Sequence, residues 1–500
     1  MIWTILLLVL LIFILTNRWR CKGEPPLDKG AIPWLGHALE FGKDASKFIN
    51  RMKMKHGDVF TVRVAGRYVT MLLDPHSYDT VLGDSDSLDF TRYAQVLMDR
   101  IFRLRLPYSQ QAKSNEIMKR HFVGMNLATL NSAMSRNLRA LMKAKTTQNQ
   151  KDWKEEGLFN FSYSLLFRAG YLTLFGGKQN NNPIDPLSVY KEYKKFDGLL
   201  VKMARGTLRQ EEKKTAQSVQ NKLWELLAPA GLTDDSGSSP WLHAYRQFLQ
   251  EDGTDAEMQN RAILMQLWAT QGNVGPAAFW LLGFLLTNPE ALMAVKREFS
   301  QNTQMETTTG TPLMDSQVNT PVFDSALEEA LRLTAGPFIT REVVREKTLC
   351  MADGRRYLLR KGDRVCLFPY VSPQMDPEIY HEPQKYKYDR FLREDGSVKK
   401  DFYKGGKRLK YYTMPWGAGT NGCVGKQFAI NTIRQFVYVV LTDYDLELCG
   451  PNAQMPEINT SRYGFGMLQP EGDLPENEQE QQLYAHFNTK TLFILSLCPL

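Results

Sequence analysis

Apolar residues recur at helical spacing along much of the chain, and the longest such run is the clearest element that the sequence predicts. It extends from about Glu257 to Thr287, with Asp255 placed to cap its start and Asn288-Pro289 to end it. At a rise of 1.5 Å per residue this helix would be roughly 45 Å long. Its C-terminal half is apolar on nearly all sides, so we expect it to be buried.

The middle of this helix contains residues that weaken a helix. Gly272, Gly275 and Pro276 lie within one turn or so of each other. Proline has no amide donor and crowds the carbonyl four residues earlier, so we expect free backbone groups at this point. A tolerated kink is the simple explanation, and a break that serves a functional site is the other.

The remaining pattern predicts a mostly α chain with a smaller β region. Val59–Leu73 is rich in β-branched residues and is interrupted by Gly66-Arg67, which indicates a hairpin. Polar breaks rich in Gly and Pro are short enough to be surface loops, and no internal repeat is visible. We therefore expect one catalytic domain over 37–500.

The N-terminus is almost wholly apolar over 2–16 and is followed by Arg18 and Arg20. This run is shorter than the ~20 residues of a comfortable membrane span and also resembles the core of a cleaved signal. No cationic stretch precedes it, and the positive charge lies on its C-terminal side, which favours a cytosolic body. We expect an uncleaved membrane anchor at 1–22 and a stiff proline-rich hinge at 23–36.

Charge and cysteine usage narrow the class of protein. The 500 residues hold 62 basic and 54 acidic side chains, a net charge of +8 that is too diffuse to indicate nucleic-acid binding but is compatible with an anionic membrane surface. The six cysteines show no CxxC and no metal-finger spacing, which is typical of a reduced, cytosol-facing chain. Most such cysteines are small buried hydrophobes.

Cys423 differs from the other cysteines because it follows a glycine-rich loop, Pro415–Gly425, and precedes an apolar helical run. Helix N-terminal amides favour a thiolate, and glycines let a flat ligand approach closely. Such a thiolate is a nucleophile or a metal ligand. The seven histidines form no motif that would supply a Cys-His dyad. The loop also contains Gly417-x-Gly419-x-x-Gly422, but Pro415 interrupts the strand that a dinucleotide fingerprint requires, and too little chain follows.

Three charged residues form a second constellation. Glu329 and Arg332 are three residues apart on a helix expected at Phe323–Leu333, hence on one face. Arg390 follows in the segment Pro383–Phe391. Alone, an exposed pair of this kind contributes little. Together the three residues are expected to form a buried ionic lock beneath the thiolate loop.

This order of motifs resembles the cytochrome P-450 superfamily, which has E-x-x-R, then P-x-x-[FY]-x-P-x-R-F, then F-x-x-G-x-[HR]-x-C-x-G. The resemblance covers essentially the whole chain and implies that fold, with a long central helix over a buried haem b whose iron is held by Cys423. Trp416, Asn421 and Tyr388 depart from the pattern. The residues that the resemblance suggests around the haem are Arg341, Lys119, Trp416 and Gly417.

The resemblance also bears on the reaction. Oxygen-activating members carry [AG]-G-x-[DE]-T on the long helix, and here Gly272 and Asn273 stand at the acid and alcohol positions. Segments such as Trp268–Trp280 and Ser461–Gly466 resemble the branch that rearranges prostaglandin endoperoxides. This implies an isomerase that converts prostaglandin H2 to prostacyclin by O–O homolysis, without NADPH, dioxygen or a reductase, at the endoplasmic reticulum membrane.

The expected catalytic residues are Cys423 and Asn273, the latter positioning the endoperoxide. The expected substrate contacts are Arg100, Leu106, Trp268, Gly272, Asn273, Val274, Thr340, Arg341 and Arg364. For each arginine, a solvated charge or a haem-propionate partner is the competing interpretation. Two other functions stay open: a microsomal sterol hydroxylase of the bile-acid pathway that needs NADPH and a reductase, and a non-catalytic haem- or lipid-binding protein.

Overall fold

The structure is a computed structural model that describes residues 3, 19–147, 154–179, 182–227, 237–309, 319–449, 453–471 and 484–489. The expected membrane anchor therefore falls largely outside the described residues. Within them, no single helix is long and apolar enough to cross a membrane. Residues 256–286 and 289–302 pass that test only as a pair, and the pair is bent by 109°.

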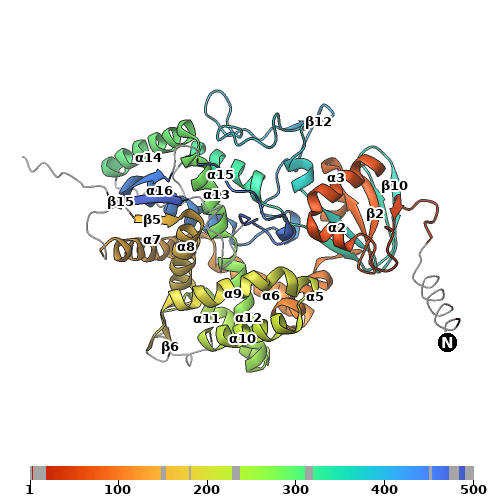
Figure 1. Cartoon of the computed structure of the whole chain (residues 1–500), viewed down its shortest axis with the longest axis horizontal. Coiled ribbons are helices and arrows are strands. Elements are labelled where there is room, and N and C mark those ends of the chain that lie inside the picture. Colours follow the sequence, from red (N-terminus) through yellow and green to blue (C-terminus); the bar gives the residue numbers. More distant parts are fainter. Residues whose placement is uncertain are drawn as a thin grey trace, which may run out of the picture.

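Helices make up most of the described chain, as the sequence predicts (Figure 1). They are α2 (Ala38–Lys43), α3 (Ala45–His56), α4 (Asp79–Leu82), α5 (Phe90–Phe102), α6 (Tyr108–His121), α7 (Gly124–Thr147), α8 (Leu158–Leu174), α9 (Pro186–Arg205), α10 (Gln210–Leu227), α11 (Pro240–Glu251), α12 (Ala256–Gln271), α13 (Val274–Leu286), α14 (Pro289–Thr309), α15 (Pro321–Thr334) and α16 (Lys426–Asp443).

The strands form one larger sheet and several small ones. The larger sheet has the order β1-β2-β3-β11-β8-β4 and lies with α2 and α3 at one end of the molecule, at the right in Figure 1. Its strands are β1 (Leu27–Asp28), β2 (Val59–Val64), β3 (Arg67–Leu72), β4 (Leu88–Asp89), β8 (Ile339–Val343) and β11 (Arg364–Leu367). The smaller sheets contain β5 (Lys154–Gly157), β6 (Lys178–Gln179), β7 (Asn182–Pro183), β9 (Lys347–Cys350), β10 (Arg356–Leu359), β12 (Tyr403–Lys404), β13 (Lys407–Arg408), β14 (Tyr444–Leu448) and β15 (Tyr484–Thr489).

The structure confirms one of two local predictions and modifies the other. The hairpin is confirmed, since β2 and β3 pair antiparallel and turn at Ala65-Gly66. The segment 23–36 is not a free-standing spacer, because β1 pairs in parallel with β2 and Gly36 bridges Val64. Backbone hydrogen bonds of this kind fix an otherwise stiff segment onto the sheet edge.

The long helix is broken where its glycines and proline predict. Asp255 caps α12 through the amide of Met258, and the break falls at Gly272-Asn273. Pro276 lies in the first turn of α13, where a missing amide is tolerated. It leaves the carbonyl of Gly272 without its helical partner, and the hydroxyl of Tyr163 donates to that carbonyl at 3.4 Å instead.

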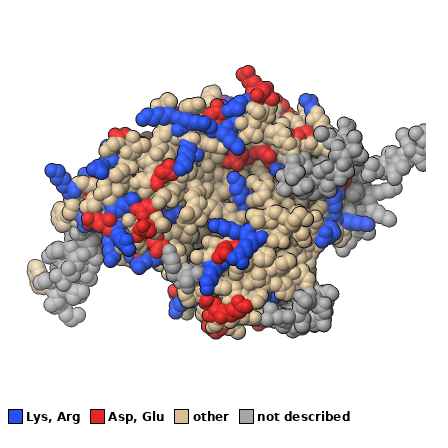
Figure 2. Space-filling model, turned by 180° about the vertical axis from the view of Figure 1, so that it is seen from behind, with Lys and Arg blue, Asp and Glu red and all other residues tan. Residues whose placement is uncertain are grey.

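The main core surrounds the second half of this helix. Nearly every residue of α13 is buried, against α8, α15 and α16. The prediction that this half is buried on all sides is therefore confirmed. On the face drawn in Figure 2, basic and acidic side chains are interspersed over the described surface, in keeping with the small net charge.

Candidate active site

A cavity of about 450 Å³ lies between the broken helix and the cysteine loop. Its walls come from α6, α12, α13, the chain that follows α15, and the loop before α16. Cys423, Trp416 and Gly417 lie in one wall, and Asn273 and Val274 lie in another. Most of the remaining lining is apolar, so the cavity suits a large apolar ligand with a few polar contacts.

The cysteine loop places Cys423 just ahead of a buried helix, as expected. The amide of Cys423 donates to the carbonyl of Trp416 at 2.8 Å, which closes the loop, and α16 begins at Lys426. Burial raises the pKa of the Cys423 thiol, although the amides of Gly425 and Lys426 and the charge of Lys426 act in the opposite direction. A bound metal ion deprotonates such a thiol outright, so the site suits a metal ligand better than a free nucleophile.

The residues around Cys423 fit a haem. Within the described part of the chain, no group of three or more His, Cys, Asp or Glu residues is placed to hold a metal ion, so a single thiolate suits a metal carried by a macrocycle. The indole Nε1 of Trp416 is buried without a hydrogen-bond partner beside the cavity. Arg341 adds a buried cation to the lining; its guanidinium lies 5.1 Å from the ring of Phe90.

Among the described residues that line the cavity there is no Asp or Glu that could relay a proton. Position 272 is glycine, and the hydroxyl of Thr270 donates to the carbonyl of Gln266 at 2.8 Å within its own helix. Asn273 is the polar residue at the break, and its Oδ1 accepts from the amide of Met467 at 2.9 Å. Val274 supplies only an apolar surface to the cavity.

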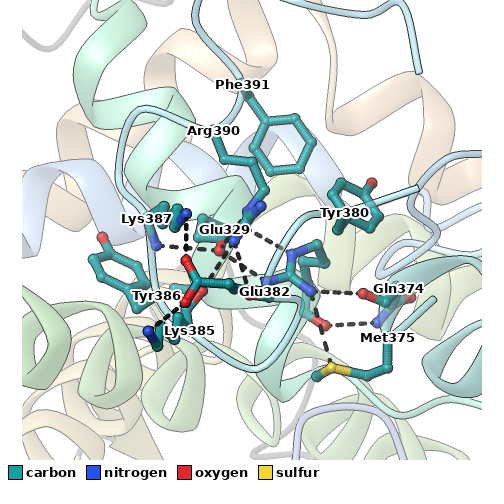
Figure 3. A network of polar contacts seen from close by, with 12 residues as sticks. Glu329, Gln374, Met375, Tyr380, Glu382, Lys385, Tyr386, Lys387, Arg390 and Phe391 are labelled. Carbon is teal, nitrogen blue, oxygen red and sulfur yellow. Dashed lines mark hydrogen bonds and ion pairs between the residues drawn. The ribbon is translucent and has the colours of Figure 1, made fainter. Parts of the chain in front are cut away.

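Glu329, Arg332 and Arg390 lie together as a buried ionic triad. Figure 3 shows Glu329 and Arg390 within it. Both carboxylate oxygens of Glu329 accept from Arg332, at 2.7 and 2.8 Å, and Arg390 donates to Glu329 at 2.8 Å. Arg332 also donates to the carbonyl of Gln374 at 2.6 Å. The triad joins α15 to the segment that leads to the cysteine loop. Within the triad, the carboxylate and the guanidinium groups compensate one another's buried charge.

A second group of expected site residues gathers on the other face of the sheet. Side chains alternate along a strand, so Arg341 faces the cavity, whereas Thr340 faces away from it with Arg364 of the paired β11. The guanidinium of Arg364 lies 5.0 Å from the ring of Tyr93. Burial lowers the pKa of Arg364, and the charges of Arg67 and Arg100 act in the same direction, against the opposing effects of Tyr93 and Glu342.

The other expected residues lie outside the cavity lining. Gly272 and Trp268 lie at the helix break, where the ring of Trp268 is 5.7 Å from that of Phe102. Leu106 packs against the main core. Lys119 is exposed on α6, whose Ser114, Asn115 and Met118 do line the cavity.

The sequence reasoning missed part of the lining. Gln266, Ala269 and Ala277 share the cavity face with Asn273, and their spacing of three or four residues along the helix would have found them. Phe90, Phe338 and Met467 come from segments far apart in the sequence, and no periodic pattern joins them.

Comparison with known proteins supports the interpretation of this cavity as a haem site. The family model described as cytochrome P450 matches residues 25–475. The chain is 53% identical to prostacyclin synthase of Rattus norvegicus over 472 residues, which are 91% of this chain and 94% of that protein. It is 52% identical to prostacyclin synthase of Homo sapiens, with the same coverage, and 40% identical to 7-alpha-hydroxycholest-4-en-3-one 12-alpha-hydroxylase of Homo sapiens, over 91% and 93% of the two chains.

The matched region contains the ionic triad, the broken helix and the cysteine loop, and members of this family hold haem through a cysteine thiolate. The fold expected from the sequence, mostly helical with a smaller β region, is confirmed. The chain belongs to the cytochrome P450 family.

Proposed function

We propose that this chain is an isomerase that converts prostaglandin H2 to prostacyclin at a haem b held by Cys423, without NADPH, dioxygen or a reductase. One observation carries the proposal: at the break of the long helix, where an oxygen-activating enzyme needs an acid and an alcohol, this chain has Gly272 and Asn273, and Asn273 lines the same cavity as Cys423. The prostacyclin synthases of rat and human, which are 53% and 52% identical to this chain, support the same reaction.

Haem bound through Cys423 would supply an iron that coordinates one peroxide oxygen and promotes O–O homolysis, which thiolate donation favours. Trp416 and Gly417 would lie against its cysteine side, and Arg341 and Lys119 would approach its propionates. Arg341 is the better placed of the two cations, because it lines the cavity and is buried, whereas Lys119 is exposed.

Asn273 would bind an endoperoxide oxygen, since it is a neutral polar group at the break of the helix. Val274 would complete the apolar surface beside it. An amide suits this role because it donates a hydrogen bond without offering an acidic proton to the opening peroxide.

The carboxylate of the substrate would bind the second group of residues. The charge of Arg100 lowers the pKa of Arg364, although the carboxylate of Glu342 acts in the opposite direction, and no ion pair of either arginine is seen among the described residues. On α5, Phe90 stands over Arg341 and Tyr93 stands over Arg364, so this helix runs beside both groups. Thr340, Leu106, Trp268 and Gly272 would shape the passage between them.

The cellular setting follows from the same proposal. The relatives support a place at the endoplasmic reticulum membrane. Residues 1–22 would anchor the chain, residues 23–36 would lead into the catalytic body over 37–500, and that body would face the cytosol. An isomerase of this kind exchanges no electrons with a reductase.

Purified, haem-loaded protein should convert prostaglandin H2 to 6-keto-prostaglandin F1α, the hydrolysis product of prostacyclin, when NADPH and reductase are left out. Cys423→Ala should abolish both turnover and the thiolate-type ferrous–CO spectrum. The sterol hydroxylase relative at 40% identity defines the competing outcome. Oxidation of a sterol that depends on NADPH and reductase, with no endoperoxide turnover, would overturn the proposal in favour of a hydroxylase, and binding of either lipid without turnover would indicate a carrier.

A further inference from the structure

Asn273 directs its side chain away from the helix that it begins. An asparagine at the position before a helix normally accepts from the amide of the second or third helical residue. The third residue of α13 is Pro276, which has no amide hydrogen. The side chain of Asn273 makes no capping bond, so its oxygen is available to another partner.

That partner is the amide of Met467, 2.9 Å from Oδ1 of Asn273. A backbone N–H only donates, so the oxygen of the side-chain amide must face Met467 and its NH2 must face the other way. Asn273 lines the cavity, and no described residue is seen to accept a hydrogen bond from its NH2. The amide therefore presents a donor to the cavity.

The segment that holds Asn273 is itself fixed. Gly336 donates to the carbonyl of Gly466 at 3.0 Å, and Gly464 donates to Gly336 at 2.8 Å. Gly466 has φ +90°, and a Cβ at this position would stand 2.4 Å from Oδ1 of Asn273. Only glycine meets both requirements, the left-handed backbone and the close approach to the amide.

We propose that Gly466 and the amide of Met467 form a positioning element that fixes the side-chain amide of Asn273 with its NH2 toward the reacting oxygen of the endoperoxide. This inference rests on the proposed function. The NH2 of Asn273 then recognises a ligand oxygen that accepts a hydrogen bond. It offers no acceptor to a ligand hydroxyl that has to donate one.

A double-mutant cycle on the haem-loaded enzyme tests this inference. Gly466→Ala should lower kcat/KM for prostaglandin H2 by about tenfold or more, because the new Cβ displaces the amide. Asn273→Ala should have a similar effect, and the double variant should be no worse than Asn273→Ala alone, because the two changes remove one interaction. Multiplicative losses would overturn the inference.

Gly464→Ala is the matched control. Gly464 lies in the same segment at φ +96°, but a Cβ there would meet Phe338 rather than Asn273. Its effect should multiply with that of Asn273→Ala. The ferrous–CO spectrum of each variant reports whether thiolate ligation is intact, and a variant that loses it is excluded from the cycle.

Asn273→Asp keeps the inference falsifiable if Gly466→Ala does not fold. The aspartate oxygen still accepts from Met467, but the ionised side chain offers the cavity no donor. Measured at a pH at which this carboxyl is ionised, and with the ferrous–CO spectrum intact, the variant should lose at least tenfold in kcat/KM. Full activity would overturn the donor role.

The positioning element can also be tested if the proposed function is wrong. If the parent enzyme does not turn over prostaglandin H2, the same cycle is run on the dissociation constant of a bicyclic analogue whose O–O bridge is replaced by a non-cleavable oxygen bridge, followed by the haem spectrum. If the double variant binds the analogue no more weakly than Asn273→Ala does, the positioning element stands without the proposed reaction. If the two losses in binding free energy add, the positioning element is overturned.

Discussion

The hydroxyl of Tyr193 occupies the space that a side chain at position 272 would need. A Cβ built on Gly272 would lie 2.8 Å from that hydroxyl oxygen and 2.8 Å from the carbonyl of Trp268. Tyr193 is fully buried, among other aromatic rings. The position at which oxygen-activating members of the family carry an acid is therefore closed by packing in this chain.

Gly272→Ala should accordingly destabilise the protein by about 1–3 kcal/mol, the usual cost of overpacking a core. Denaturant unfolding measures the difference. Gly198→Ala is the matched control: Gly198 is exposed on α9, and a Cβ there meets nothing within 4 Å. It should leave stability unchanged or raise it by up to about 1 kcal/mol, because alanine favours a helix over glycine. Equal effects of the two substitutions would show that position 272 is not closed.

Arg390→Ala should disrupt the ionic triad. It leaves the charge of Glu329 buried and partly unpaired, a situation that costs about 3–5 kcal/mol. We expect a lower free energy of unfolding and less haem bound per chain, measured by denaturation and by absorbance. Arg393→Ala removes an exposed pair with Asp401 and should change stability by no more than about 1 kcal/mol. A fully stable Arg390→Ala protein would contradict a structural role for the triad.

Asp376 and Lys404 make stability depend on pH. Burial alone would raise the pKa of Asp376, but the hydrogen bond from Lys404, 2.6 Å long, and its charge outweigh this and lower it. A lowered carboxyl pKa stabilises the fold above the ordinary value of ~3.9 and loses that contribution as the pH falls further. Lys404→Met should therefore cost about 3 kcal/mol at pH 7 and much less near pH 3.

Urea unfolding of both proteins across this pH range measures the effect of Lys404→Met. Lys410→Met serves as its control, since Lys410 pairs with the exposed Asp79. That substitution should have a small effect at every pH. A difference between Lys404→Met and the parent that is constant from pH 3 to pH 7 would contradict the assignment.

Arg364→Leu should weaken binding of the substrate carboxylate. A hydrogen bond between charged groups contributes about 1.5–3 kcal/mol, so KM for prostaglandin H2 should rise about tenfold or more. The methyl ester of the substrate should be almost unaffected by the substitution. Arg105→Leu removes an exposed arginine that pairs with Asp99 and should change neither value. Equal losses for acid and ester would place the carboxylate elsewhere.

Much of this fold could be predicted because local patterns determine it. The hairpin at Gly66, the cap at Asp255 and the break near Gly272 each depend on residues within one or two turns of chain. The sequence did not predict that 23–36 would join the sheet, because strand pairing depends on a partner, Thr61, that is distant in sequence.

The site residues also fall into those that a local pattern predicts and those that depend on contacts distant in sequence. Cys423 and Asn273 stand in recognisable local contexts, and both line the cavity. Thr340 and Arg341 are neighbours in sequence and were expected to act together, but strand alternation sends them to opposite faces of the sheet. The hydrogen bond between Met467 and Asn273 joins segments with 193 residues between them, and no periodicity reveals such a contact.

The fate of the two endoperoxide oxygens tests the proposed reaction most directly. Prostaglandin H2 labelled with ¹⁸O in both bridge positions is incubated with the haem-loaded protein under argon, with no NADPH or reductase. Isomerisation predicts 6-keto-prostaglandin F1α that retains both labels, because the O–O bond is broken and both atoms stay in the product. Absence of product until dioxygen, NADPH and reductase are supplied, or loss of either ¹⁸O label from the product, would contradict the isomerase.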